Sequence, residues 1–271
     1  MSKARAGAVV AAWALVVPVA AAAQEREWSG PITESAAARA LMDNGGTRQE
    51  RERALALALD LGPRAGPELK AAVIEAAWAE WRVDRGTGAA IVGGLQASET
   101  GLDYMQAVAE GRDPRGIPLL IAAPVGSRAI PSALADFGPA LTFAPVLAAA
   151  ADPEGHRYIV TKCLTALRFM VEEGALSPRQ LARVRQAVRE RLHGPQDYSI
   201  VAHALRLGFA LGDSELRRRI EELATDRAAV EEILDSSYSD TYHLNYVQEQ
   251  ARAALSGDPL PPYRLPPRPP R

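Results

Sequence analysis

The sequence predicts an all-α protein, built as an α-solenoid of about five antiparallel helical hairpins. Three observations support this class: an alanine-rich composition, apolar residues every three or four positions, and glycines at a nearly fixed interval. Alanine supplies 52 of the 271 residues, whereas aromatic residues make up only 6% of the chain. Alanine has the highest helix propensity, while strands favour the β-branched and aromatic residues that are sparse here. We therefore expect helices and no strands.

Capping residues mark where the helices are expected to begin. Asp113-Pro114, Asp152-Pro153 and Ser177-Pro178 each place a capping side chain before a proline at the first helical position. A proline costs nothing there, because the N–H that it lacks has no partner within the helix. Asp213 and Asp226 are expected to cap two further helices. Between these marks, apolar residues recur at helical spacing and predict one buried stripe per helix.

Five glycines are spaced almost evenly and are expected to end helices. They lie 39, 37, 36 and 38 residues apart, at Gly62, Gly101, Gly138, Gly174 and Gly212. Glycine tolerates the left-handed conformation that closes one helix before an antiparallel partner starts. The interval predicts a repeat of one hairpin, which buries its apolar face only by stacking on its neighbours. The expected hairpins span residues 47–83, 88–123, 127–151, 153–192 and 197–225.

The repeats of residues 47–225 are expected to be flanked by four other segments. Residues 1–23 predict a signal peptide, because Lys3 and Arg5 precede an apolar run that Pro18 ends before three small residues. An uncleaved membrane anchor is the alternative, although the run is short for a spanning helix. Residues 24–46 are expected to hold a short helix. Residues 226–257 are expected to form two capping helices near 226–236 and 240–256, and residues 258–271 a disordered tail rich in proline and arginine.

Charge and cysteine content narrow the class of protein further. The formal net charge is −2, and it becomes −4 once Lys3 and Arg5 are removed with the signal peptide. A mildly acidic chain lacks the basic surface of nucleic-acid-binding proteins, so we expect no nucleic-acid partner. Cys163 is the only cysteine, which rules out an internal disulfide, and no cysteine follows the apolar run to carry a lipid. We expect a periplasmic or secreted bacterial protein with no stable membrane insertion after cleavage.

The turns into the second helix of three expected hairpins share a pattern of glycine, then proline, then leucine. It occurs as Gly62-Pro63 with Pro67 and Leu69, as Gly138-Pro139 with Pro145 and Leu147, and more loosely as Pro118-Leu119-Leu120. In this pattern the chain resembles the HEAT and HEAT-like repeat family over most of residues 47–225. The second unit departs from it, because four glycines between 86 and 94 interrupt an expected helix. Tetratricopeptide and other helical-pair repeats are alternatives.

The HEAT resemblance implies a curved scaffold that presents a groove to a protein or peptide, usually without catalysis. A minority of the family, similar to the bilin lyases, are enzymes. The resemblance therefore implies a binding protein first and an enzyme second.

No residue pattern predicts a catalytic, metal or cofactor site. The histidines, His156, His193, His203 and His243, lack the short paired spacings of metal ligands. No Gly-x-Ser-x-Gly elbow occurs. The glycines between 86 and 94 predict a flexible turn, since no buried strand precedes them as a phosphate-binding loop requires. Cys163 is expected in the core, beside Lys162, and His203 is expected to be partly buried.

Tyr238, Tyr242 and Tyr246 are the candidate partner-binding residues. Their spacing of four places them on one helix face if that helix begins early enough, and tyrosine offers a large contact area with a polar tip. Sealing of the terminal repeat is the other role considered for them.

We expect a non-catalytic scaffold for a protein or peptide partner in the cell envelope, of undetermined oligomeric state. The alternatives are an enzyme whose inner-face site holds His203 or His243 beside carboxylates, and a structural spacer in the envelope.

Overall fold

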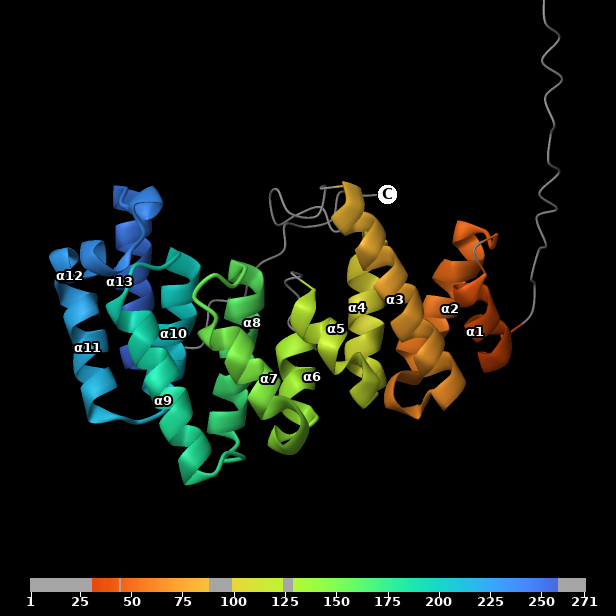
Figure 1. Cartoon of the computed structure of the whole chain (residues 1–271), viewed down its shortest axis with the longest axis horizontal. Helices are drawn as coiled ribbons and strands as arrows, with labels where there is room; N and C mark the ends of the chain where they lie inside the picture. The colour runs from red at the N-terminus through yellow and green to blue at the C-terminus, as the bar shows by residue number, and fades with distance from the viewer. Residues whose placement is uncertain (1–30, 44, 88–98, 124–128, 258–271) are drawn as a thin grey trace, which may run out of the picture. The chain divides into compact units, whose positions relative to one another are not determined.

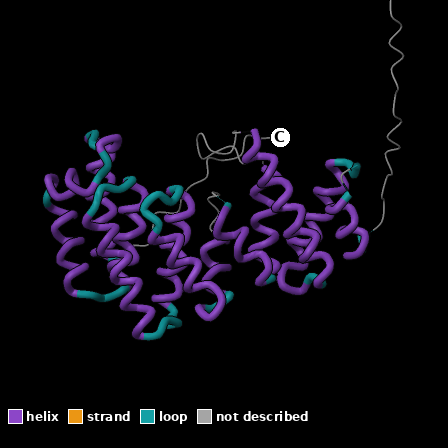
Figure 2. The backbone as a smooth tube through the Cα atoms, in the orientation of Figure 1, coloured by secondary structure: helices purple, strands orange, loops and turns teal. Residues whose placement is uncertain are grey.

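The computed structural model describes residues 31–43, 45–87, 99–123 and 129–257. Within these ranges α-helices and short 3₁₀ helices are joined by loops, and no described residue belongs to a strand (Figure 1 and Figure 2). The all-α prediction is confirmed. The predicted signal peptide at 1–23 and the predicted tail at 258–271 lie outside the described residues.

The described residues form thirteen α-helices, α1 to α13, and three 3₁₀ helices, η1 to η3. Those of the first half are α1 (Glu34–Met42), α2 (Arg48–Leu61), η1 (Gly62–Arg64), α3 (Pro67–Thr87), α4 (Glu99–Gly111), η2 (Pro114–Gly116), α5 (Ile117–Ala122) and α6 (Ala129–Asp136). Those of the second half are α7 (Pro139–Ala151), α8 (Arg157–Glu172), α9 (Pro178–His193), α10 (Tyr198–Ala210), α11 (Ser214–Thr225), α12 (Arg227–Ile233), η3 (Ser236–Tyr238) and α13 (Thr241–Ser256). Helices are therefore found in every expected hairpin range.

Most of the expected helix starts are confirmed. Ser177 forms a capping box with Gln180 at the start of α9, while Asp213 and Asp226 accept backbone N–H bonds at the starts of α11 and α12. Asp113 caps the short helix η2. The start expected at Asp152-Pro153 is wrong.

Asp152 instead follows the last residue of α7, and its carboxylate accepts a hydrogen bond from the Glu154 N–H at 3.1 Å. This bond closes a turn, and α8 begins only at Arg157, where the His156 ring accepts from the Tyr158 N–H. An aspartate before a proline favours a turn as well as a helix start, so the local pattern alone did not distinguish the two.

Four of the five expected glycines do have the positive φ that glycine tolerates without steric cost, although the ψ angles of Gly62 and Gly138, −123° and 155°, lie outside the left-handed helical region. Gly62, Gly138, Gly174 and Gly212 have φ angles of 50°, 81°, 66° and 62°. The prediction that Gly101 ends a helix is wrong, because Gly101 lies inside α4, which continues to Gly111. The left-handed residue after α4 is Arg112, with φ of 50°. The even glycine interval therefore does not hold across the second hairpin.

The helices contact mainly those that lie one or two elements away in the chain. α4, α6, α8, α10 and α13 contact one another in succession, while α7 packs on α8, α9 on α10 and α11 on α13. In Figure 1, α9 and α11 lie in front of α10 and α13. Buried apolar side chains form one cluster that runs through the described helices. Each helix therefore packs mainly on helices that are near it in the chain.

Basic side chains connect several of these helices by capping the end of an earlier one. Arg191 of α9 donates to the Ala150 carbonyl at the end of α7, with Nε and Nη2 at 3.1 and 2.9 Å. Three further pairs share this arrangement: Lys162 with the Ala123 carbonyl, Arg219 with Leu192 at 3.1 Å, and Arg252 with Ala224 at 3.1 Å. Such bonds satisfy carbonyls that a helix end leaves unpaired and place positive charge at its negative pole.

Candidate partner-binding surface

The loops before α10 and η3 bring tyrosines together from distant parts of the chain. The isolated β-bridge joins Gln196 to Leu234, with Gln196 N–H donating to the Ile233 carbonyl at 2.9 Å and Asp235 N–H donating to Gln196 at 2.9 Å. These bonds fix the residues just before Tyr198 next to those just before Tyr238. α10 also packs directly on α13, which carries Tyr242 and Tyr246.

Tyr198 is the centre of the resulting group of rings. Its centroid lies 5.3 Å from that of Tyr238, 5.4 Å from Tyr246 and 4.4 Å from His243. The ring of Tyr242 lies 5.2 Å from His243. Most of these pairs meet edge to face, the geometry that aromatic rings favour. We call these five residues, Tyr198, Tyr238, Tyr242, His243 and Tyr246, the tyrosine surface.

The three predicted tyrosines belong to this surface but do not share one helix face. α13 begins at Thr241, so Tyr238 precedes it and lies in η3. Tyr238 and Tyr246 are half-buried against the core, whereas Tyr242 is 70% exposed. Tyr198 was not predicted as a member, because nothing local to position 198 indicates what it meets 40 residues later. His243 was considered only for an enzyme site.

Carboxylates border the tyrosine surface. Asp197 lies 3.7 Å from the Arg157 guanidinium, and its hydrogen bond with Tyr238 is the main cause that raises the pKa of that phenol. A hydrogen bond from the His243 backbone N–H lowers the pKa of Asp240, whose carboxylate also lies 2.8 Å from the His243 ring. A bond from the Ser237 N–H lowers the pKa of Asp235. These lowered pKa values favour the negative form of two exposed carboxylates beside the rings.

Farther along α8, α10 and α13 lies a second polar group, centred on His203. Its Nδ1 is 2.9 Å from the Thr165 hydroxyl, and Arg206 nearby donates to the Gln250 side chain at 2.8 Å. Burial, followed by the charges of Arg168 and Arg206, lowers the pKa of His203 to about 4. The imidazole is therefore neutral at neutral pH. Its partly buried side chain agrees with the prediction for His203.

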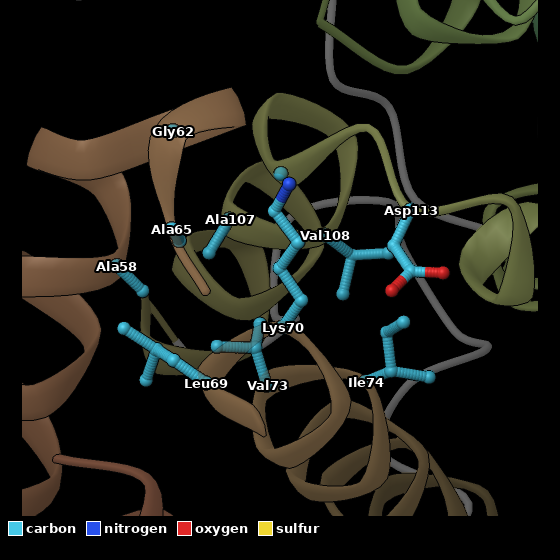
Figure 3. A pocket seen from close by; sticks show the side chains of 11 residues that line it. Ala58, Gly62, Ala65, Leu69, Lys70, Val73, Ile74, Ala107, Val108 and Asp113 are labelled. Carbon is cyan, nitrogen blue, oxygen red and sulfur yellow. The ribbon is translucent and has the colours of Figure 1, made fainter. Parts of the chain in front are cut away.

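Two of the cavities among the described residues lie elsewhere, and neither of these two is lined by a histidine. One, shown in Figure 3, measures about 10 Å³ and is enclosed largely by apolar side chains, including Leu69, Val73 and Val108. That volume holds about one water molecule. The other is an open groove of about 420 Å³, bordered by the Arg112–Asp136 ion pair, whose atoms are 2.6 Å apart.

The other residues considered for chemistry, Cys163 and His156, lie in the core and at a helix end. Cys163 is fully buried as predicted, and burial raises the pKa of its thiol to about 11. His156 caps α8, and burial is the main cause that lowers its pKa. Among the described residues, no group of three or more histidine, cysteine or acidic side chains is placed to hold a metal ion.

The fold and the surface together define an all-α helical protein with an aromatic, acid-bordered surface. Comparison of the chain with protein-family models, with curated proteins and with solved structures finds no match. The HEAT resemblance stays a prediction. Within the described part of the chain, no helix has the length and apolar character needed to cross a membrane.

Proposed function

We propose that this chain is an exported, non-catalytic helical-repeat scaffold of the HEAT-like α-solenoid type, which binds a protein or peptide partner in the cell envelope. The observation that carries the proposal is the tyrosine surface, where five rings from three parts of the chain meet and Tyr242 remains 70% exposed. Tyrosine is among the residue types that dominate binding energy at protein interfaces.

The packing of the surface supports binding by a preorganised site. Tyr198, Tyr238 and Tyr246 are held against the core and one another, so their side chains have little freedom left to lose on binding. Tyr242 adds an exposed ring to these packed tyrosines. Preorganisation of this kind raises affinity because less conformational entropy is lost when the partner binds.

The alternative of an enzyme receives less support from the same region. His243 does lie beside a carboxylate, that of Asp240, but both belong to the surface start of α13 and neither lines the two cavities described. The charges that act on His203 are those of arginines. A deep cleft that brings a histidine and a carboxylate together was the feature expected of an enzyme.

The test is crosslinking capture from envelope extracts, using the chain from Gln24 onward and its Tyr242→Ala variant. We expect the variant to capture its main partner about tenfold less, a loss of about 1.4 kcal/mol that suits an interface tyrosine. Leu141→Ala is the matched control, because Leu141 is also an exposed apolar side chain, at 53%, but lies on α7.

Equal capture by the wild-type chain and Tyr242→Ala would place the binding surface elsewhere. Capture of no macromolecule, either by the wild-type chain or by a variant without residues 258–271, would overturn the scaffold proposal.

A further inference from the structure

The exposed edge of the tyrosine surface has the features of a site for a proline-rich segment. Tyr242 projects next to His243 and the half-buried Tyr246, the exposed carboxylate of Asp240 lies at the His243 ring, and the exposed carboxylate of Asp235 caps η3. Aromatic surfaces bind polyproline II segments well, because the extended segment is already ordered and its proline rings pack flat on aromatic rings. Asp197 is paired with Arg157, and Arg227 donates to the Thr241 hydroxyl. A preference for a basic segment therefore rests on the exposed carboxylates of Asp235 and Asp240.

The chain itself carries a segment of this chemistry directly after α13. Residues 258–271 contain seven prolines and three arginines, Arg264, Arg268 and Arg271, against one acidic side chain, Asp258. The side-chain charge of the segment is therefore +3 − 1 = +2. Its sign complements the carboxylates of Asp235 and Asp240 at the tyrosine surface.

The length of the segment also fits. α13 has 16 residues, so its start lies about 24 Å from its end. A polyproline II chain advances about 3.1 Å per residue, so about eight residues after Gly257 cover that distance. The remaining six, Pro266 to Arg271, would span about 19 Å over the rings. The exposed residues Glu249 and Asn245 lie on α13 between its end and Tyr242.

We infer that residues 266–271, Pro-Pro-Arg-Pro-Pro-Arg, dock on the tyrosine surface of their own chain. The prolines cover the rings of Tyr242 and Tyr246, and an arginine lies beside Asp240. The inference rests on the proposed function, because segment and partner then compete for one surface. A partner binds only by displacing the segment, whose attachment gives it an effective concentration in the millimolar range.

The test is chemical protection of Tyr242 in the full chain. Tetranitromethane modifies accessible tyrosines, and mass spectrometry gives the rate for each one. We compare the wild-type chain with an Arg264→Glu, Arg268→Glu, Arg271→Glu variant, whose substitutions lie outside the described helices and keep the length of the segment. Tyr104 is the internal control, because it is 4% exposed and stays unmodified while the chain is folded.

We expect Tyr242 to react at least fivefold faster in the charge-reversed variant, and a synthetic peptide of residues 258–271 to restore protection. Protection in the wild-type chain should not change on dilution, since the segment belongs to the same molecule. Equal rates in both chains would overturn the inference. Protection that fades on dilution would also overturn it, because the occupant would then be the segment of a second copy.

Partner capture separates this inference from the proposed function. If Tyr242 is nitrated at the same rate in both chains but Tyr242→Ala still loses its partner, the docking inference is wrong and the scaffold proposal stands. If Tyr242 is protected by the segment and no macromolecule is captured by the charge-reversed variant, the scaffold proposal fails while the docking remains.

Discussion

His203 shows how the surroundings of a single side chain set a pH dependence. Burial and the charges of Arg168 and Arg206 lower its pKa from 6.5 to about 4 in the folded chain. Below pH 6.5 the unfolded chain binds a proton that the folded chain does not. The stability that His203 provides above that pH is therefore lost as the pH falls toward 4.

We expect the free energy of unfolding to fall by up to about 3 kcal/mol between pH 7 and pH 4 on account of His203. His203→Asn keeps a polar group near the Thr165 hydroxyl but does not titrate, so its unfolding should depend less on pH. Urea unfolding at several pH values measures the difference. Parallel curves for the two chains would mean that other groups cause the acid sensitivity.

Gly174 illustrates a residue whose conformation, rather than its contacts, requires glycine. Its φ is 66°, and a Cβ added there would have no atom within 4 Å. Gly174→Ala should therefore lower the free energy of unfolding by about 1–2 kcal/mol through backbone strain alone. Gly194→Ala is the control, because the φ of Gly194 is −125° and its Cβ would make ordinary contacts. A similar loss from both variants would contradict the argument.

At the scale of the element, Arg191 connects the end of α7 to the loop that precedes α10. Its guanidinium donates to the carbonyls of Ala150 and Asp152 and, at 2.8 Å, to the Gln196 side chain. Gln196 in turn forms the bridge with Leu234 that positions Tyr198 beside Tyr238. One buried arginine thus supports both a helix end and the geometry of the tyrosine surface.

Arg191→Met should lower the free energy of unfolding by about 2–4 kcal/mol, since it leaves the buried carbonyl of Ala150 without its donor. Arg179→Met, on the exposed start of the same helix, should change it by less than about 0.5 kcal/mol. Thermal or urea unfolding measures both. If Arg191→Met were as stable as Arg179→Met, the capping of α7 would not contribute to stability.

At the scale of the whole molecule, contacts between successive helices predict that a local change stays local. Leu244 of α13 is 1% exposed, and Leu244→Ala should remove about 2–5 kcal/mol of local packing. Hydrogen exchange should then rise in α10 to α13 and remain unchanged in α1 to α4, because stacked units are stabilised by their neighbours. A uniform rise along the chain would indicate one cooperative unit instead.

Local sequence was enough to predict the helices and most of their ends. Capping residues such as Ser177 and left-handed glycines such as Gly174 act on backbone groups a few positions away, so their effects could be inferred from neighbours in the chain. The two errors have the same origin. Asp152 closes a turn and Gly101 is tolerated inside a helix, and each suits a second conformation that only the packing of the surrounding helices selects.

Contacts between distant residues depended on the tertiary structure alone. Tyr198 meets Tyr238 because a backbone bridge joins their loops, and Arg191 reaches Ala150, 41 positions earlier, because α9 packs against α7. Composition and spacing showed that tyrosines gather near position 240. The tertiary structure decided which of these tyrosines are half-buried and which is exposed. The two causes are the start of α13 at Thr241 and the contact of Tyr198, from α10, with Tyr238 and Tyr246.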